Sequence, residues 1–521
     1  MHRLFSFIAG CAVVAGCATA APTPAAAPTP VQSPATAPSP AASANATDRP
    51  PASPSALPGP AGFLKPCDDD PTTFCGHLDV PVDRAKPEGE KIALALRLVP
   101  HTDPSRPALA TVLSLPGGPG SWAGAGPGYE HDSGVLSEAL VLRHDELLMD
   151  PRGTGGSGAI DCPDLQDGFA SDTELQTAVA ACAAQLGENA DRYGSGDIAL
   201  DIEAVRAFLG LDQLDLYGVS YGTVYARAYA SRFPDRVHAL VLDSGVAIED
   251  PAYHWWEGYP RAWLQIAARY CAASTTCTQH HPDPEAELGA LIRSVRAKPI
   301  HGSVDGSDVV LDSAALIGIL RAVGPSPENL EAERLLDAAS AHAKGDDGPL
   351  LGMGELANLN LWSVDSGDPA RWSEGMHAAA SCNDEPVNQD PTEPVAERAA
   401  MLEAAIAALP KDAFEPFTVG EWVPTLLPDY CLAWPVPDRY EPSIGPSTTS
   451  QVPTLVLVGE QDGVVPAHVQ RRLLDVFPNS TWAPVAGAVH SVLGWSICPR
   501  DLLAEFLDTL HVDGGTCAPK P

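Results

Sequence analysis

Residues 214–222 read LDLYGVSYG, and this short stretch indicates how the middle of the chain folds. Residues 214–217 have the composition of a short strand, and residues 221–233 have the apolar spacing of a helix. Glycines on both sides of Ser220 permit a strained strand-to-helix turn, in which a larger flanking side chain would collide with neighbouring backbone. The hydroxyl group is then expected to face open space near the positive end of a helix dipole. We therefore predict that Ser220 is a nucleophile.

Strand and helix patterns alternate on both sides of this turn. Strands are expected at residues 91–100, 110–115, 146–149, 237–242 and 454–458, and helices at residues 197–209, 469–476 and 502–510. Alternation at this spacing is typical of right-handed crossovers in a mostly parallel sheet flanked by helices, so the predicted fold class is α/β.

The alternation stops between about residues 250 and 450, where helical patterns, proline-rich turns and seven of the ten tryptophans occur. We expect a largely helical inserted lid at residues 251–450. The α/β core would then comprise residues 63–250 and 451–521.

An acid and a histidine follow Ser220 in the order that a serine triad on such a fold requires. Asp462 comes after the expected strand at residues 454–458, and His490 follows the next short strand. A serine hydroxyl needs a base within hydrogen-bond reach, and the base needs a carboxylate that holds one tautomer. We predict His490 as the base and Asp462 as the acid.

Four other residues are candidates for these two roles. Asp243 ends the strand after the nucleophile, where some hydrolases place the acid, and Glu460 lies close to Asp462. His468 and His511 fall in helical patterns and are expected to be ordinary surface residues. Asp462 and His490 are preferred over all four.

A tetrahedral intermediate also needs backbone N–H donors aimed at its oxyanion. The N–H of Tyr221, directly after the nucleophile, should be one donor. The other is expected from the PGGPG loop at residues 116–120, because the absence of side chains lets its backbone approach a substrate. Gly118 is the first choice for this donor and Gly117 the second.

Several motifs together resemble a known enzyme family. They are GGPG at residues 117–120, DPRGTGGSG at 150–158, GVSYG at 218–222, GEQDGVVP at 459–466, the segment around His490, and CLAWP at 431–435. The first five, in this order, resemble the tripeptidyl and prolyl aminopeptidase-like branch of the α/β-hydrolases over about Cys67 to Cys517, and CLAWP is similar to the C-terminal signature of that branch. The resemblance implies an α/β-hydrolase fold and an exopeptidase that removes one to three residues from peptide N-termini through an acyl-enzyme on Ser220.

The resemblance also implies how a substrate would be held. Members of that branch use lid carboxylates to bind the free α-amine of the substrate. Asp384 and Glu385, in the sequence SCNDE at residues 381–385, stand where such acids are expected. Acids on a solvated loop are the alternative interpretation of this segment.

Two other functions remain open at this point. An esterase or amidase acting on small molecules is the first, because this fold hosts many reactions behind variable lids. The second is a lipid-anchored binding protein on a catalytically inactive hydrolase fold. The intact serine, histidine, aspartate and glycine loops argue against the second.

The N-terminus has the sequence pattern of an export signal. His2 and Arg3 precede an apolar run at residues 4–16, which is too short to cross a bilayer and is typical of a signal peptide. Its end, VAGC at residues 14–17, resembles the bacterial lipobox, so residues 1–17 are expected to be a signal and Cys17 the lipidated residue. An ordinary secretory signal cut near Ala20 or Ala21 is the alternative.

Residues 18–62 are expected to be a disordered tether, because they consist almost entirely of Ala, Pro, Ser and Thr. The chain is therefore predicted to be an exported bacterial cell-envelope lipoprotein, in the periplasm or on the outer surface, with release to the medium as the alternative. Its only predicted contact with a membrane is the lipid anchor.

The cysteines suit an oxidising compartment. Of the 12 cysteines, Cys11 is lost with the signal and Cys17 is lipidated, which leaves an even number. Pairing neighbours along the chain predicts the disulfides Cys67–Cys75, Cys162–Cys182, Cys271–Cys277, Cys382–Cys431 and Cys498–Cys517. No Cys-x-x-Cys or Cys/His spacing indicates a metal site.

The charge of the chain bounds its partners. Its 521 residues carry 31 Lys+Arg against 67 Asp+Glu, a formal net charge of −36. A surface of that sign repels the phosphates of nucleic acids, so nucleic-acid binding is not expected. A solubilising surface is the preferred interpretation and a cationic substrate the alternative. No cofactor is predicted, the expected partner is a peptide or a small amide or ester substrate, and the sequence does not set the oligomeric state.

Overall fold

The computed structural model describes residues 57–103, 105–126, 138–167, 172–248, 256–304, 306–323, 330–354, 367–384, 393–435, 443–444, 451–512 and 517. The expected signal, Cys17, Glu385 and all but residues 57–62 of the expected tether lie outside this set. Among these described residues, no helix has the length and hydropathy needed to span a membrane.

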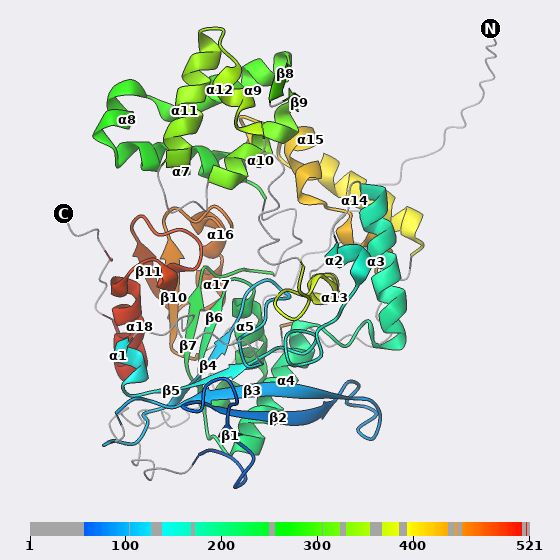
Figure 1. The fold of residues 1–521 in the computed structure, drawn as a ribbon, viewed down its shortest axis with the longest axis vertical. Helices are drawn as coiled ribbons and strands as arrows, with labels where there is room; N and C mark the ends of the chain where they lie inside the picture. The colour runs from blue at the N-terminus through cyan, green and yellow to red at the C-terminus, as the bar shows by residue number, and fades with distance from the viewer. Residues whose placement is uncertain are drawn as a thin grey trace, which may run out of the picture. The chain divides into compact units, whose positions relative to one another are not determined.

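One mixed sheet of nine strands organises the described residues (Figure 1). In spatial order its strands are β1 (Lys65–Pro66), β2 (Phe74–Pro81), β3 (Lys91–Val99), β5 (Asp145–Met149), β4 (Thr111–Leu115), β6 (Leu214–Val219), β7 (Val237–Asp243), β10 (Thr454–Gly459) and β11 (Thr481–Val485). Pairing is antiparallel from β1 to β5 and parallel from β5 to β11. The predicted α/β class with a mostly parallel sheet is confirmed.

Helices cover both faces of the sheet. Leu216 of β6 belongs to a core cluster with α3 (Asp172–Leu186), α4 (Ser195–Leu209) and α5 (Gly222–Arg232). Its neighbour Tyr217 belongs to a second cluster with α1 (Glu138–Val141) and α18 (Ile497–Thr509). Successive side chains of a strand point to opposite faces, so β6 is buried on both sides, as expected for a parallel strand between helices.

The inserted region has a hydrophobic core of its own. The buried residues of this third cluster include Trp263, Leu288, Leu335, Phe414 and Trp422. The elements of the region are α7 (Tyr259–Ala272), α8 (Thr275–His280), α9 (Pro284–Ala297), β8 (Ile300–Val304), β9 (Ser307–Leu311), α10 (Ser313–Val323), α11 (Leu330–Ala343), α12 (Gly348–Leu351), α14 (Val395–Ala407) and α15 (Val419–Trp422). The region is largely helical, as predicted, but it also contains the antiparallel pair β8–β9.

One helix of the inserted region packs with the sheet. Met376 and Ala379 of α13 (Glu374–Asp384) are fully buried in the cluster that contains α4 and α5. Helix α13 therefore lies against the α/β core, although its sequence falls within the region predicted as a lid.

Some predicted elements differ in their bounds. The helix expected at residues 469–476 is two short helices, α16 (Ala467–Gln470) and α17 (Leu473–Val476). The last helix begins at Ile497, five residues before the predicted start, since Pro499 is tolerated in a first turn where its missing N–H has no intrahelical partner. One further short helix is α2 (Pro163–Gln166).

Among the described residues there are five disulfides, with the pairing that the sequence predicted. They are Cys67–Cys75, Cys162–Cys182, Cys271–Cys277, Cys382–Cys431 and Cys498–Cys517. Disulfides at this number are typical of proteins in oxidising compartments, which is consistent with export.

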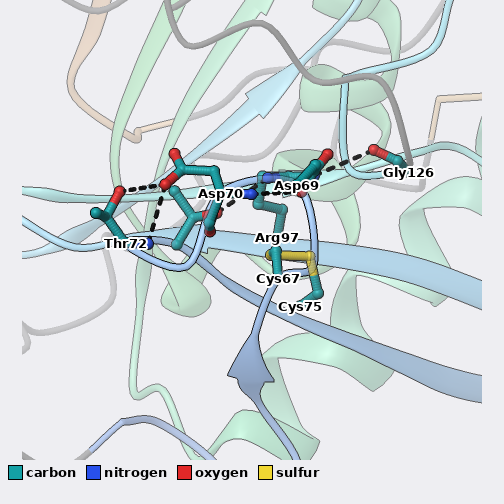
Figure 2. Close-up of a disulfide and its surroundings, with 8 residues drawn as sticks. Cys67, Asp69, Asp70, Thr72, Cys75, Arg97 and Gly126 are labelled. Atoms are coloured by element: carbon teal, nitrogen blue, oxygen red, sulfur yellow. Dashed lines mark hydrogen bonds and ion pairs between the residues drawn. A yellow bond between two sulfur atoms is a disulfide. The ribbon is translucent and has the colours of Figure 1, made fainter.

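The first disulfide closes a loop that is held by a buried arginine (Figure 2). Arg97 on β3 is 1% exposed and donates to Asp69 (2.8 Å) and to Thr73 (2.9 Å) of this loop. The guanidinium lowers the pKa of the Asp69 carboxyl. The same guanidinium donates to the backbone oxygen of Gly126 (3.2 Å). Arg97 thereby ties the disulfide loop to the segment that follows the predicted PGGPG loop.

Glu146 has a buried carboxyl group on a central part of the sheet. It lies on β5, is 3% exposed, and accepts a hydrogen bond from Ser114 Oγ on β4 (2.7 Å). Burial raises its pKa from 4.5 to about 7. Because the pKa is raised on folding, the fold favours the protonated form: the stabilisation is complete below the unfolded pKa and is lost as pH rises through the folded pKa.

We expect Glu146→Gln, which mimics the protonated form, to gain stability over the wild type as pH rises. The difference should be small at pH 4.5 and grow to about 3 kcal/mol at pH 8, since each pKa unit corresponds to ~1.4 kcal/mol. Urea unfolding at several pH values with disulfides intact measures it. The exposed Glu505→Gln is the control, and a Glu146→Gln effect that does not change with pH contradicts the expectation.

Candidate active site

Ser220 lies at the end of β6 in a strained turn. Its φ of 53° places the backbone in the left-handed region, which residues other than glycine rarely adopt. A Cβ on Gly222, the first residue of α5, would lie 2.2 Å from the backbone oxygen of Leu115, so only glycine fits there. The Ser220 N–H donates to the backbone oxygen of Asp243 on β7 (2.9 Å). The sequence prediction of a serine on a tight strand-to-helix turn is therefore met by the geometry.

His490 and Asp462 lie side by side on loops that follow β11 and β10. The His490 Nδ1 atom is 3.1 Å from Asp462 Oδ1 and 3.0 Å from Asp462 Oδ2. The Asp462 side chain is fully buried, whereas that of His490 is 17% exposed. Backbone N–H groups of Val464 (2.9 Å) and Val465 (2.8 Å) also donate to Asp462 Oδ1, which fixes the carboxylate.

The charge of Asp462 sets the protonation of His490. Burial disfavours the imidazolium, but the Asp462 carboxylate outweighs this effect, and Asp243 adds to it, so the pKa of His490 is raised above its ordinary value. A hydrogen bond from Nδ1–H to a carboxylate leaves Nε2 as the acceptor of a neutral imidazole. His490 can therefore act as a base through Nε2.

Asp243, the first rival for the acid, has its carboxylate bonded to groups other than His490. Its carboxylate accepts the backbone N–H groups of Val492 (2.8 Å) and Leu493 (3.1 Å) and the hydroxyl of Tyr217 (2.9 Å). It holds the chain directly after His490 and leaves the Nδ1 atom of His490 to Asp462.

The remaining rivals lie at the surface. Glu460, His468 and His511 are all exposed, and His468 Nε2 lies 2.8 Å from the backbone oxygen of Glu257.

Helix α7 of the inserted region contacts the loop that carries Asp462, because Tyr259 Oη donates to the backbone oxygen of Val464 (3.1 Å).

The glycine loop lies directly against the nucleophile. A Cβ on Gly117 would be 2.9 Å from the Cβ of Ser220 and 3.4 Å from its Oγ, so a side chain at this position would collide with the serine. A Cβ on Gly118 would lie 3.4 Å from the ring of Trp372. The structure thus places Gly117 against Ser220, the residue before Tyr221, and places Gly118 beside Trp372.

The segment before and within α13 holds this loop. The Ser373 N–H donates to the backbone oxygen of Gly120 (3.0 Å), and the Trp122 N–H donates to that of Arg371 (3.3 Å). His377 Nδ1 lies 3.0 Å from the backbone oxygen of Pro119. Since a carbonyl oxygen only accepts, His377 carries its proton on Nδ1 there.

Aromatic rings flank the same loop. The ring centroids of Trp372 and His377 are 5.8 Å apart, and those of His377 and Tyr430 are 5.9 Å apart. Trp372 is buried, and the other two side chains are partly exposed. This group forms an aromatic border beside the glycine loop.

The DPRGTGGSG segment supplies two buried charges whose roles the sequence did not reveal. Asp150 is fully buried and accepts the backbone N–H groups of Ala123 (2.8 Å) and Ala125 (3.1 Å), just after the glycine loop. Arg152 is also fully buried and donates two hydrogen bonds to the carboxylate of Asp201 on α4, in a bidentate ion pair (2.6 and 2.7 Å). Charged residues within a glycine-rich stretch were the only sequence signal for these roles.

Asp384, a predicted anchor of the substrate amine, has its carboxylate occupied by protein donors. It is 2% exposed, and it accepts the N–H of Ser195 (2.8 Å), the Ser195 hydroxyl and the Tyr221 hydroxyl (3.1 Å). Burial raises its pKa to about 6. Glu385, the other predicted anchor, lies outside the described residues.

Two family models and several curated proteins are similar to this chain. A family model described as "alpha/beta hydrolase fold" matches residues 110–278, and a second, described as "TAP-like protein", matches residues 416–517. Tripeptidyl aminopeptidase of Streptomyces coelicolor is 30% identical over 270 residues, which are 45% of this chain and 48% of that protein. The chain thus spans about half the length of that relative.

A second relative aligns over more of its length. Serine protease Hip1 of Mycobacterium tuberculosis is 29% identical over 485 residues, which cover 86% of each chain. Among solved structures, proline iminopeptidase of Mycobacterium smegmatis gives a TM-score of 0.37 at 14% identity, over 84% of this chain and 98% of that one. That structural likeness is too weak to carry an argument. The sheet order, the strained serine turn and the two family models together show that this chain has an α/β-hydrolase fold with a TAP-like C-terminal part, similar to tripeptidyl aminopeptidases.

Proposed function

We propose that the chain is an exported serine exopeptidase that removes one to three residues from peptide N-termini through an acyl-enzyme on Ser220. The observation that carries this proposal is the pairing of His490 Nδ1 with the buried Asp462 carboxylate, 3.0 Å away, on a loop tied through Asp243 to the Ser220 turn. A base oriented in this way can activate a serine hydroxyl that is otherwise a poor nucleophile.

The proposed steps use these residues as follows. His490 Nε2 takes the proton of Ser220 Oγ as that oxygen attacks the peptide carbonyl carbon. The resulting oxyanion accepts hydrogen bonds from the N–H of Tyr221 and from that of Gly118, with Gly117 as the alternative donor. The imidazolium then protonates the leaving amine, the acyl-enzyme forms, and a water molecule activated by His490 releases the new acid.

The peptidase assignment is supported by the relatives, which are named as a tripeptidyl aminopeptidase, a serine protease and proline iminopeptidases. The aromatic group of Trp372, His377 and Tyr430 beside the glycine loop suits apolar side chains of a peptide. Because protein donors occupy Asp384, Glu385 is the candidate that we keep for binding the substrate amine.

Export as a lipoprotein is part of the same proposal. The five disulfides and the lipobox-like sequence that ends at Cys17 support it. Globomycin treatment of expressing bacteria should then cause the uncleaved precursor to accumulate, and Cys17→Ser should abolish metabolic labelling with a palmitate analogue. Secretion of an unlipidated wild-type protein would contradict lipidation and leave export intact.

The substrate class is tested with matched peptides. A free N-terminal amine should be required, so tripeptidyl, dipeptidyl and aminoacyl chromogenic amides are compared with their N-acetylated forms. We expect at least one free-amine series to be cleaved and acetylation to reduce kcat/KM by roughly 10²-fold or more, since a lost charged hydrogen bond leaves a buried group unpaired. Equal turnover of free and acetylated substrates contradicts an exopeptidase and favours an esterase or amidase.

Ser220→Ala should lower kcat on the preferred substrate by roughly 10⁶ if serine, histidine and aspartate act as a unit. The control is Ser340→Ala on α11, whose hydroxyl accepts a bond from Lys344 and lies in the inserted region. Circular dichroism checks that both variants fold. A loss of tenfold or less for Ser220→Ala means that the nucleophile is another residue.

The raised pKa of His490 predicts the pH dependence of kcat/KM. Since the base must be neutral, activity is lost as pH falls through that pKa, at a pH above the ordinary histidine value of about 6.5. In Asp462→Asn the remaining effect of burial should move this loss to lower pH, and kcat should fall by roughly 10⁴. The exposed Asp475→Asn is the control, and an unshifted profile in Asp462→Asn argues against Asp462 as the acid.

A further inference from the structure

Asp384 joins three elements that are distant in sequence. It is the last residue of α13, and its carboxylate accepts the N–H of Ser195, the first residue of α4, at 2.8 Å. It also accepts the hydroxyl of Tyr221, the N-cap residue of α5, at 3.1 Å. A carboxylate at the start of α4 is favoured by the free N–H groups and the dipole of that helix.

The surroundings leave little freedom for this carboxylate. A Cβ on Gly194 would lie 2.9 Å from Asp384 Oδ1, so the chain before α4 passes directly over it. Two residues before Asp384, the disulfide Cys382–Cys431 fixes α13 to the short helix η8 (Tyr430–Ala433). The position of Asp384 is thus set by packing, by a covalent link and by hydrogen bonds.

Tyr221 connects this carboxylate to the catalytic step. Under the proposed function, its backbone N–H binds the oxyanion. Tyr221 is 5% exposed, and its ring packs edge-on against that of Tyr225, with 5.6 Å between the centroids. Its hydroxyl donates to the Asp384 carboxylate. A residue held at both its ring and its hydroxyl has little freedom to rotate its own peptide N–H.

We propose that Asp384 is a positioning residue, which fixes Tyr221 through its hydroxyl and thereby orients the oxyanion-binding N–H at the nucleophile turn. The inference rests on the proposed function, because it assigns Tyr221 N–H to the oxyanion. It differs from the role expected from the sequence, in which Asp384 would contact substrate. It makes α13, a helix of the inserted sequence, part of the support of the oxyanion site.

The charges around Asp384 predict how pH affects this support. Tyr221 and the buried Tyr225 of α5 face it, Arg232 of the same helix favours its ionised form, and α4 contributes the polar but uncharged Ser195. Below about pH 6, where burial has placed its pKa, the carboxyl takes up a proton and becomes a poorer acceptor for the Tyr221 hydroxyl.

The chain offers a matched pair of variants for the test. Tyr221→Phe and Tyr225→Phe each remove one hydroxyl from the same helix region, but the Tyr225 hydroxyl has no hydrogen-bond partner among the described residues. The readouts are the rate of labelling by a fluorophosphonate probe and the kcat and KM for p-nitrophenyl acetate. Both reactions develop an oxyanion without any peptide recognition.

We expect Tyr221→Phe to slow labelling and lower kcat by roughly tenfold, with KM within about twofold, because a hydrogen bond to a charged group is lost. Tyr225→Phe should match the wild type. Equal losses in both variants, or none in Tyr221→Phe, overturn the proposal.

Asp384→Asn supplies the second part of the test. Its amide oxygen cannot accept all the bonds that the carboxylate accepts, so we expect a similar loss, and Tyr221→Phe should add little in the Asp384→Asn background. The ratio of wild-type to Asp384→Asn rates, in which the titration of His490 cancels, should fall as pH drops through about 6. Additive effects, or a ratio that is constant with pH, overturn the proposal.

The outcomes separate this proposal from the proposed function. If the wild type is labelled but does not cleave free-amine peptides, the exopeptidase assignment fails while the labelling rates still decide the role of Asp384. If the folded wild type is not labelled at all, both fail. A thermal midpoint for each variant checks that a loss of rate is not a loss of fold.

Discussion

The backbone of Ser220 is held in a left-handed conformation where β6 meets α5, and the rest of the site is arranged around this turn. A non-glycine residue in that region costs about 1–3 kcal/mol. The surroundings hold it there: β6 is buried on both faces, the Ser220 N–H is bonded to β7, and Gly222 lets α5 approach β4. The strain persists because parallel strands and close glycines leave the chain no other path.

Four buried carboxylates connect the loops that surround this turn. Asp150, Asp243, Asp384 and Asp462 are each 2% exposed or less, and each accepts at least one backbone N–H group. Buried charges are costly unless they are hydrogen-bonded, so each one dictates the course of the backbone that satisfies it. Asp462 differs from the others because a histidine ring also faces it. Within a chain of net charge −36, these few acids have structural tasks that the overall charge conceals.

The sequence predicts local features well. The strands next to Ser220, the α/β class and the disulfide pairs follow from short-range patterns, and the order of Asp462 and His490 follows from their places after strands. The sequence does not reveal which elements a side chain meets over long separations. Asp384 bonds to residues 189 and 163 positions away, and no periodicity encodes such a meeting. For the same reason α13 was expected in the lid, although its small apolar residues pack with the sheet.

The central claim is that Ser220 forms a covalent acyl intermediate, and trapping that intermediate tests it most directly. A slowly released ester would be mixed with the full chain, the reaction quenched in acid within its first turnovers, and the digest analysed by mass spectrometry. The account predicts the acyl mass on the peptide that contains Ser220, and its disappearance in His490→Ala. An acyl group on another residue, or turnover without any covalent adduct, would contradict it.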